Sequence, residues 1–177
     1  MVHLWHEITP GNKKLNIVNV VIEIPMNSRC KYELDNKFGV IKLDRIIPSA
    51  VSYPANYGFI PQTLANDGDP LDVLLVSSSR FYPATLVKAR PIGVMMMVDG
   101  GVKDEKIICV PIGDPDYKND RSLKDLSTYK ITVIEEFFRV YKNLEGKKVK
   151  VKGMRNAKTA LKLIKKAVES YGVRFNK

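Results

Sequence analysis

Short runs of apolar residues, separated by turn-forming residues, follow one another along the chain as far as Pro111. These runs predict strands at residues 17–24, 38–43, 71–76, 85–98 and 107–110, of which the fourth is long enough to bend. Pro, Gly, Asn and Asp lie between them and predict turns. A later stretch, residues 147–152, alternates Lys with Val, as a half-exposed strand does.

Two segments near the C-terminal end have helical periodicity instead. In the first, Ser127 or Thr128 is placed to cap a helix, and Gly146 suits its end. Its apolar face comprises Ile131, Ile134, Phe138 and Tyr141. The second helix is expected to begin after Asn156 and to end at Gly172. Its apolar stripe comprises Ala157, Ala160, Leu161, Ile164, Ala167, Val168 and Tyr171. Strands first and helices last predict an α+β fold, a small barrel or strongly curved sheet with helices packed outside.

The composition is that of an ordinary globular protein, with 45% hydrophobic and 27% charged residues. A length of 177 residues predicts a single domain, 1–177, and no linker divides it. Cys30 and Cys109 could form one disulfide, but two reduced thiols are favoured. Residues 1–10 contain no apolar run, and residues 17–24 are too few to span a bilayer. We therefore expect a cytoplasmic protein without a membrane partner.

The net charge of +10 is unevenly distributed. Residues 142–177 contain 12 Lys or Arg against two acids, whereas the first 141 residues carry 17 charges of each sign. The favoured interpretation is a solvated, lysine-rich helix face. The alternative is a surface that attracts anions, either small phosphates or nucleic acid.

Three carboxylates fall within six residues in the segment Asp67-Gly68-Asp69-Pro70-Leu71-Asp72. Carboxylates this close repel one another unless a positive charge lies among them, and hard divalent cations prefer oxygen ligands. An acidic turn explains one or two of these acids. It explains Asp72 poorly, because Asp72 lies inside a predicted strand.

A calcium-binding EF-hand does not fit this segment. With Asp67 at position 1, the loop requires Gly at position 6 and Glu at position 12. Asp72 and Ser78 occupy these positions. The calcium-binding loop therefore fails at both positions.

Further candidate groups lie elsewhere in the chain. Asp99, Asp104 and Glu105 form a second acidic group, although Asp99-Gly100 is also a hairpin signal, and Glu23 could simply face solvent from its strand. Cationic and phenolic candidates, with one acidic neighbour, are Lys31, Glu33, Arg45, Tyr53, Tyr57, Lys106, Tyr141 and Lys142. Taken singly, each is more often a surface or core-edge residue. Together with clustered carboxylates they suit a metal-bound polyphosphate substrate.

These residues resemble those of the soluble inorganic pyrophosphatases of the compact, prokaryotic type, the first of two soluble families. The match covers nearly the whole chain, and the segment from Asp67 to Val73 resembles a highly specific signature. Other matching segments are Val21-Ile22-Glu23-Ile24-Pro25, Lys31-Tyr32-Glu33, Asp44-Arg45, Tyr53-Pro54-Ala55-Asn56-Tyr57-Gly58, Arg90-Pro91-Ile92-Gly93, Asp99, Asp104, Lys106 and Tyr141-Lys142. The resemblance implies a five-stranded, OB-like β-barrel flanked by two main helices.

The resemblance also implies several Mg²⁺ ions per active site, with Mn²⁺ or Zn²⁺ as substitutes. It implies that Asp67, Asp72 and Asp104 hold the tightest metal and that Asp72 bridges to a second. It places Asp99, Asp104 and Glu23 around the metals that arrive with the substrate, Glu23 through water.

The remaining implied roles concern the substrate pyrophosphate. Asp69 is expected to take a proton from the attacking water, and with Tyr57, Arg45 and Lys31 it makes up the expected catalytic set. The expected phosphate clamp consists of Lys31, Arg45, Tyr57, Lys106, Tyr141 and Lys142. Glu33 and Tyr53 are expected to support these groups from behind. The resemblance further implies a homohexamer, and no specific nucleic acid is expected as a partner.

Two features depart from the family pattern: Met154 stands where a Trp is usual, and the C-terminal segment is unusually basic. Other classes of protein also remain open. The strand pattern and the charge would suit an OB-like nucleic-acid-binding module, against which the clustered carboxylates argue. A passive metal-binding protein is a second alternative. A nucleotide phosphohydrolase is a third, although the sequence has no P-loop.

Overall fold

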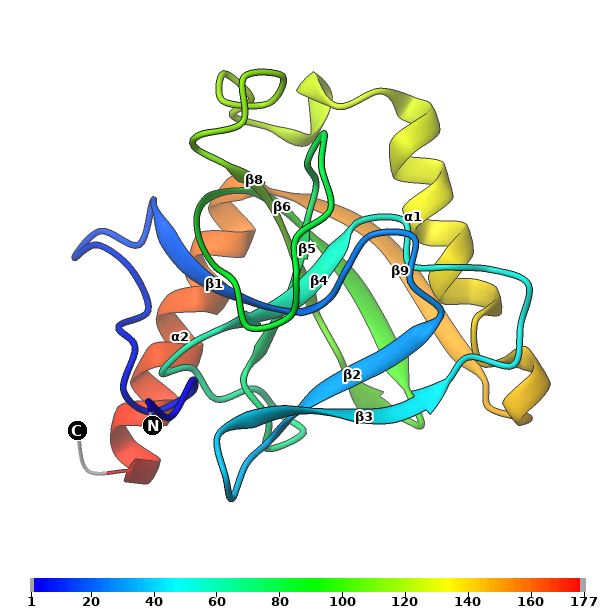
Figure 1. Cartoon of the computed structure of the whole chain (residues 1–177). Coiled ribbons are helices and arrows are strands. Elements are labelled where there is room, and N and C mark those ends of the chain that lie inside the picture. Colours follow the sequence, from blue (N-terminus) through cyan, green and yellow to red (C-terminus); the bar gives the residue numbers. More distant parts are fainter. Residues whose placement is uncertain (1, 176–177) are drawn as a thin grey trace.

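Five strands close into a ring in the computed structural model, which describes residues 2–175. In order around the ring they are β1 (Val18–Ile24), β4 (Asn56–Ile60), β5 (Leu71–Leu75), β8 (Lys106–Pro111) and β6 (Leu86–Asp99). The ring closes because β6 pairs with β1 through Val18 and Ala89 as well as with β8. The predicted five-stranded, OB-like barrel is confirmed (Figure 1).

The remaining elements are attached to this barrel (Figure 1). The long strand β6 also pairs with β7 and β9, whereas β2 and β3 form a separate hairpin that lies across the barrel. Their bounds are β2 (Cys30–Asp35), β3 (Val40–Ile46), β7 (Val102–Lys103), β9 (Val149–Asn156), α1 (Thr128–Val140), α2 (Ala157–Phe175) and the short 3₁₀ turns η1 (Leu123–Asp125) and η2 (Asn143–Glu145).

Each main helix buries one apolar face against the barrel. Ile134, Phe137 and Phe138 of α1 pack into the cluster that contains Ile24 and Met95. The apolar stripe of α2 packs through Ala160, Ile164 and Ala167 on a second cluster, which contains Val18 and Val73. Both helices thus lie outside the barrel, as the periodicity predicted.

The hairpin β2–β3 differs from the predicted strand at residues 38–43. Asp35 accepts hydrogen bonds from the backbone of Lys37 and Phe38 at 3.0 Å, and Gly39 has a φ of 67°. Residues 36–39 therefore form a turn, and β3 begins at Val40. Phe38, expected in the strand, lies exposed in this turn.

Strand β4 was not predicted from the hydrophobic pattern. Its five residues, NYGFI, are all buried, so they lack the alternation that marks a half-exposed strand. Gly58 is required there, because a Cβ atom at this position would lie 1.9 Å from the carbonyl oxygen of Val21. At Gly58, β1 and β4 thus lie too close together to leave room for a side chain.

The helix ends also differ from prediction. Ser127 caps α1, accepting a hydrogen bond from the backbone of Lys130, but the helix ends at Val140. Gly146, in the left-handed conformation, ends the following turn η2 instead. α2 continues past Gly172 to Phe175, whose ring packs 5.4 Å from that of Trp5. This packing offsets the cost of one glycine in a last turn, about 1 kcal/mol.

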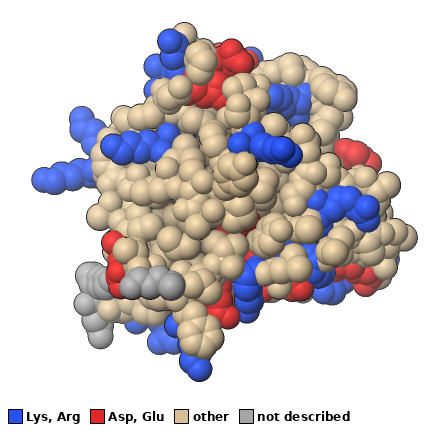
Figure 2. Space-filling view, in the orientation of Figure 1, with Lys and Arg blue, Asp and Glu red and all other residues tan. Residues whose placement is uncertain are grey.

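The basic C-terminal segment forms solvated surfaces. On β9, Lys150 and Lys152 are exposed, whereas Val149 and Val151 pack against the core, as the alternation predicted. Met154 pairs with Met95 of β6 and packs beside the same core. Figure 2 shows Lys and Arg side chains in separate groups on the face it displays. Within residues 2–175, no helix is long and apolar enough to cross a membrane.

Candidate active site

A cavity of about 540 Å³ lies between the barrel, the hairpin β2–β3 and the C-terminal end of α1. Of the fourteen residues to which the resemblance assigns a role, thirteen line it and the exception is Arg45. The thirteen are Glu23, Lys31, Glu33, Tyr53, Tyr57, Asp67, Asp69, Asp72, Asp99, Asp104, Lys106, Tyr141 and Lys142. The fold therefore gathers residues that are spread over 120 positions of the sequence.

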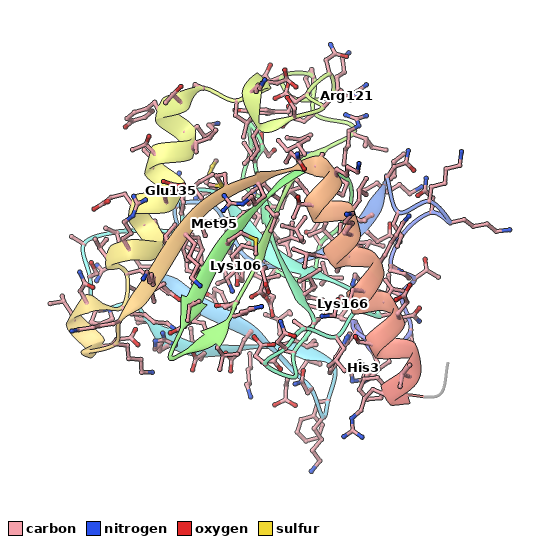
Figure 3. All side chains as sticks on the ribbon, turned by 180° about the vertical axis from the view of Figure 1, so that it is seen from behind. His3, Met95, Lys106, Arg121, Glu135 and Lys166 are labelled. Carbon is pink, nitrogen blue, oxygen red and sulfur yellow. The ribbon has the colours of Figure 1, made fainter. Side chains whose placement is uncertain are left out.

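Two parallel strands bring an acid and a base together at the centre of this cavity. β5 and β8 pair with Val73 opposite Ile107, so Asp72 and Lys106, each one residue earlier, lie side by side. The ammonium of Lys106 donates hydrogen bonds to both Asp72 and Asp104. Lys106 lies among the barrel strands in Figure 3, and its side chain is only 5% exposed. The positive charge of Lys106 thus neutralises Asp72 and Asp104, two of the candidate metal ligands.

The loop between β4 and β5 carries Asp67 and Asp69. The Asp67 carboxylate accepts a hydrogen bond from the backbone nitrogen of Asp69 at 3.1 Å, and Gly68 between them has a φ of 94°. Asn36, at the turn of the hairpin, donates from its side-chain amide to Oδ1 of Asp69 at 2.9 Å. The Asx turn at Asp67 fixes the direction of the Asp67 carboxylate, and the bond from Asn36 fixes that of Asp69.

The opposite side of the cavity is formed where α1 ends. Tyr141 caps the helix, and Lys142 follows it and pairs with Asp99 at the end of β6. The Lys142 ammonium also lies 5.3 Å from the centre of the Tyr141 ring. The aromatic packing of Tyr141 on Phe137 holds this end of the helix in place.

Lys31 and Arg45 lie opposite each other on the hairpin. Lys31 pairs with Glu33 at 2.8 Å and with Asp44 at 3.0 Å. Arg45 pairs with Asp44 and, at 2.8 Å, with Glu145. Asp44 therefore bridges the two cations and holds them near each other.

Glu23 is a buried acid on the barrel wall, only 6% exposed. Its Oε1 accepts a hydrogen bond of 2.7 Å from the backbone nitrogen of Leu34, which ties β1 to β2. Burial, together with the nearby Asp72, raises the pKa of Glu23 to about 8. In the metal-free protein at neutral pH this carboxyl is mostly protonated.

Asp67 and Asp104 also lie in an excess of negative charge. Loss of hydration, with repulsion from Asp72, raises the pKa of Asp67 and of Asp104. Burial alone would lower the pKa of Lys106, but Asp72 and Asp104 outweigh it and raise that pKa well above its ordinary value. The cavity thus favours additional positive charge.

The donor set suits a hard divalent cation. Its candidate ligands are carboxylate oxygens, which Mg²⁺ prefers, and the raised pKa values of Asp67 and Asp104 indicate that these two carboxylates are short of neutralising charge. Within residues 2–175, no three Asp, Glu, His or Cys side chains already surround one point in a way that would hold a metal. Lys106 is paired with one oxygen each of Asp72 and Asp104, and Lys142 with one oxygen of Asp99, so these lysines neutralise part of the cluster.

Three of the tyrosines that line the cavity are held in the neutral form. Burial raises the pKa of Tyr53, Tyr57 and Tyr141 well above the ordinary value, and neighbouring carboxylates add to the shift around Tyr57 and Tyr141. Each phenol therefore keeps its proton at neutral pH and can donate it in a hydrogen bond.

Sequence reasoning assigned no role to several residues that complete this site. Asn36, Tyr32, Asp35 and Lys42 line the cavity, and Glu145 holds Arg45. The turn signal around Gly39 could have placed Asn36 at a hairpin tip, but nothing local connects Glu145 with a residue 100 positions away.

Comparison with known proteins gives a consistent result. The family model described as "Inorganic pyrophosphatase" matches residues 20–172. An "Inorganic pyrophosphatase" from Synechocystis is 45% identical over 162 residues, which are 92% of this chain and 96% of the relative. A "Soluble inorganic pyrophosphatase 2" from Chlamydomonas reinhardtii is 44% identical over 96% of this chain and 88% of its own length.

Solved structures agree in fold over nearly the same range. The structure of an inorganic pyrophosphatase from Thermus thermophilus superposes with a TM-score of 0.92 at 39% identity, covering 96% of this chain and 99% of that chain. One from Helicobacter pylori superposes with a TM-score of 0.88 at 42% identity, covering 93% and 98%.

Proposed function

The chain belongs to the inorganic pyrophosphatase family and has the activity of an inorganic diphosphatase; from this premise we propose that the cavity between barrel and hairpin is its active site. A divalent metal is the family's cofactor, and we propose Mg²⁺, with Mn²⁺ or Zn²⁺ as substitutes. The observation that carries the proposal is the meeting of clustered carboxylates with the Lys and Tyr groups of the clamp around one cavity.

The proposed metal ligands are the carboxylates along the barrel side of the cavity. Asp67, Asp72 and Asp104 would hold the tightest ion, with Asp72 shared with a second, and Asp99 and Glu23 would face the ions that arrive with pyrophosphate. Bound there, such ions would polarise phosphate oxygens and would lower the pKa of a bound water molecule to near neutrality. The raised pKa values of Asp67, Asp104 and Glu23 support this assignment, because each carboxylate gains from a nearby cation.

Asp69 is the proposed general base. Oδ1 of Asp69 is engaged by Asn36, which leaves Oδ2 to accept the proton of the attacking water. The water oxygen forms a bond to one phosphorus, and the bond from that phosphorus to the bridging oxygen breaks. Two phosphates result, and no covalent intermediate with the protein is needed.

The proposed clamp stabilises the charge that develops on the leaving phosphate. Its members come from three parts of the fold: Lys31 and Arg45 on the hairpin, Lys106 and Tyr57 in the barrel, and Tyr141 and Lys142 after α1. All of them except Arg45 line the cavity. Preformed cationic and phenolic donors act strongly in such a site, because they need little reorganisation during the reaction. Glu33 supports Lys31 directly, and the ring of Tyr53 packs 5.4 Å from that of Tyr57.

The experiment that tests this proposal is a comparison of phosphate release from pyrophosphate and from ATP, with Mg²⁺ or with chelator. We expect phosphate release from pyrophosphate to require Mg²⁺ and to be faster than phosphate release from ATP. Equal turnover of ATP would favour a nucleotide phosphohydrolase. Metal binding without phosphate release would favour a passive metal-binding protein, and a salt-sensitive gel shift with oligonucleotides would favour a nucleic-acid-binding module.

We also propose that the protein forms a homohexamer in the cytoplasm. Exposed apolar side chains such as Leu43, Ile46, Tyr82 and Leu86 support self-association, since such side chains often lie in interfaces. The free thiols of Cys30 and Cys109 support a reducing compartment. Light scattering coupled to size-exclusion chromatography tests the assembly: a mass six times 20.0 kDa is expected, and a monomer mass contradicts it.

A further inference from the structure

Arg45 is held at two of its three guanidinium nitrogens. Its Nε donates to Oε1 of Glu145 at 2.8 Å, and its Nη1 donates to Asp44. The third nitrogen, Nη2, is buried, and within residues 2–175 no atom accepts a hydrogen bond from it. A buried donor without an acceptor costs free energy. Nη2 is therefore a buried donor that the described residues leave unpaired, on a side chain that does not itself line the cavity.

Glu145 is itself firmly placed. It ends the turn η2, where its backbone nitrogen donates to the carbonyl of Lys142 at 3.0 Å. Gly146, with a φ of 68°, closes the turn by donating to Asn143 at 3.1 Å. The Glu145 side chain is 12% exposed, and its second oxygen lies 3.8 Å from the Lys147 ammonium. Its carboxylate is thus fixed relative to Lys142.

The contact between Glu145 and Arg45 joins two parts of the proposed clamp. Arg45 lies on the hairpin with Lys31, whereas Glu145 follows Tyr141 and Lys142 within one turn of chain. The hairpin is a separate two-stranded sheet, so no ladder of backbone hydrogen bonds joins it to β6 or β9. A side-chain contact between hairpin and η2 is what sets their spacing at this edge.

The chemistry of the pair suits such a task. A guanidinium presents its donors in a rigid plane, so fixing Nε and Nη1 also fixes the position of Nη2. Burial alone would lower the pKa of Arg45, but its bonds to Glu145 and Asp44 raise it, so the cation is stabilised in place. A flexible arginine would instead lose conformational freedom each time it bound a ligand.

We propose that Glu145 is a positioning residue of the phosphate clamp. Its carboxylate holds Arg45 in the orientation from which it would bind the substrate phosphate, and it holds the hairpin against the turn that carries Tyr141 and Lys142. This inference rests on the proposed function, because it requires Arg45 to bind the phosphate of pyrophosphate.

The first test compares kcat and KM for pyrophosphate among glutamate variants with Mg²⁺ present. A misplacement of about 1 Å can cost roughly 100-fold in rate, so Glu145→Ala is expected to lower kcat/KM about 10- to 100-fold. Glu145→Gln keeps an oxygen that can accept from Nε and is expected to lose less. Glu136→Ala is the matched control, because Glu136 is an exposed glutamate on α1 whose contact with Arg139 is a loose 3.7 Å. It is expected to keep wild-type kinetics.

The deciding test is a double-mutant cycle with Arg45→Ala. If Glu145 acts through Arg45, adding Glu145→Ala to Arg45→Ala lowers kcat/KM no further. If the two losses multiply, Glu145 acts independently of Arg45, and the inference is overturned while the clamp role of Arg45 stands. If Arg45→Ala alone keeps wild-type kcat/KM, the proposed clamp fails and the inference with it. Should Glu145→Ala not fold, Glu145→Gln takes its place, and its smaller loss must likewise disappear in the Arg45→Ala background.

Discussion

Lys106 donates a hydrogen bond to Asp72 from the neighbouring parallel strand, at the centre of the cavity where the metal ligands are proposed. The same ammonium also bonds to Asp104. One buried lysine therefore does in the metal-free protein part of what a divalent cation would do when bound. If Asp72 and Asp104 are metal ligands as proposed, Lys106 and the metal compete for the same carboxylates, and this competition has consequences that can be measured.

The variant Lys106→Met is expected to destabilise the metal-free protein. It removes the cation and leaves Asp72 and Asp104 in a partly dehydrated cavity, and breaking a buried pair in this way costs about 3 kcal/mol. Added Mg²⁺ is expected to restore part of this loss, because a ligand that binds only the folded state raises its stability. Urea unfolding in chelator and in Mg²⁺ measures both effects.

The matched control is Lys103→Met, which alters an exposed lysine on β7 and is expected to change the free energy of unfolding by less than about 0.5 kcal/mol. If Lys106→Met is as stable as the wild type in chelator, Lys106 is not the neutralising partner of these carboxylates.

Glu23 is expected to make the stability of the metal-free protein fall as the pH rises. In the folded protein its pKa is about 8 rather than 4.5, so between these values the folded state binds a proton that the unfolded chain has released. The contribution of Glu23 therefore decreases through this window, by about 2 kcal/mol between pH 6 and pH 8. Free energies of unfolding in chelator at the two pH values measure it.

The variant Glu23→Gln isolates this contribution, because it removes the titrating group and keeps an oxygen that can accept from Leu34. Its free energy of unfolding should fall by about 2 kcal/mol less than that of the wild type over the same interval. Glu136→Gln, at an exposed site, should follow the wild type. Parallel pH dependence of wild type and Glu23→Gln would show that Glu23 is ionised in the folded state already at pH 6.

The variant Asp69→Asn is expected to slow the chemical step while metal binding is retained. An amide cannot accept the proton of the attacking water, and general-base catalysis contributes typically 10²- to 10⁴-fold, so we expect kcat to fall by about that factor. Calorimetric titration with Mg²⁺ checks that binding persists. Loss of metal binding would reassign Asp69 as a ligand.

Much of the fold follows from local patterns, and its exceptions have physical causes. The apolar runs predicted β1, β5, β6 and β8 within one or two residues, and the periodicities predicted both helices. The fully buried strand β4 has no alternation to reveal it. The predicted start of β3 was wrong because a turn forms at Asp35. The predicted end of α2 was wrong because Phe175 packs on Trp5 and extends the helix.

The candidate site was predictable in membership but not in its connections. A recognisable signature around Asp67 and its matching segments named residues that, except for Arg45, line one cavity, whereas their individual roles stay predictions. The bond from Asn36 to Asp69 and that from Glu145 to Arg45 join distant parts of the chain. Such contacts depend on the tertiary fold, and no residue spacing in a single sequence predicts them.

The central claim is that pyrophosphate is hydrolysed at the carboxylate cluster around Asp72. The most direct measurement is steady-state phosphate release from pyrophosphate at saturating Mg²⁺ by the wild type and by Asp72→Asn, after both are shown to unfold cooperatively. Asp72→Asn removes the proposed bridging ligand while nearly preserving side-chain size, so we expect most of the activity to be lost, by about 100-fold or more. Near-normal turnover by Asp72→Asn would contradict the account and place the reaction elsewhere in the molecule.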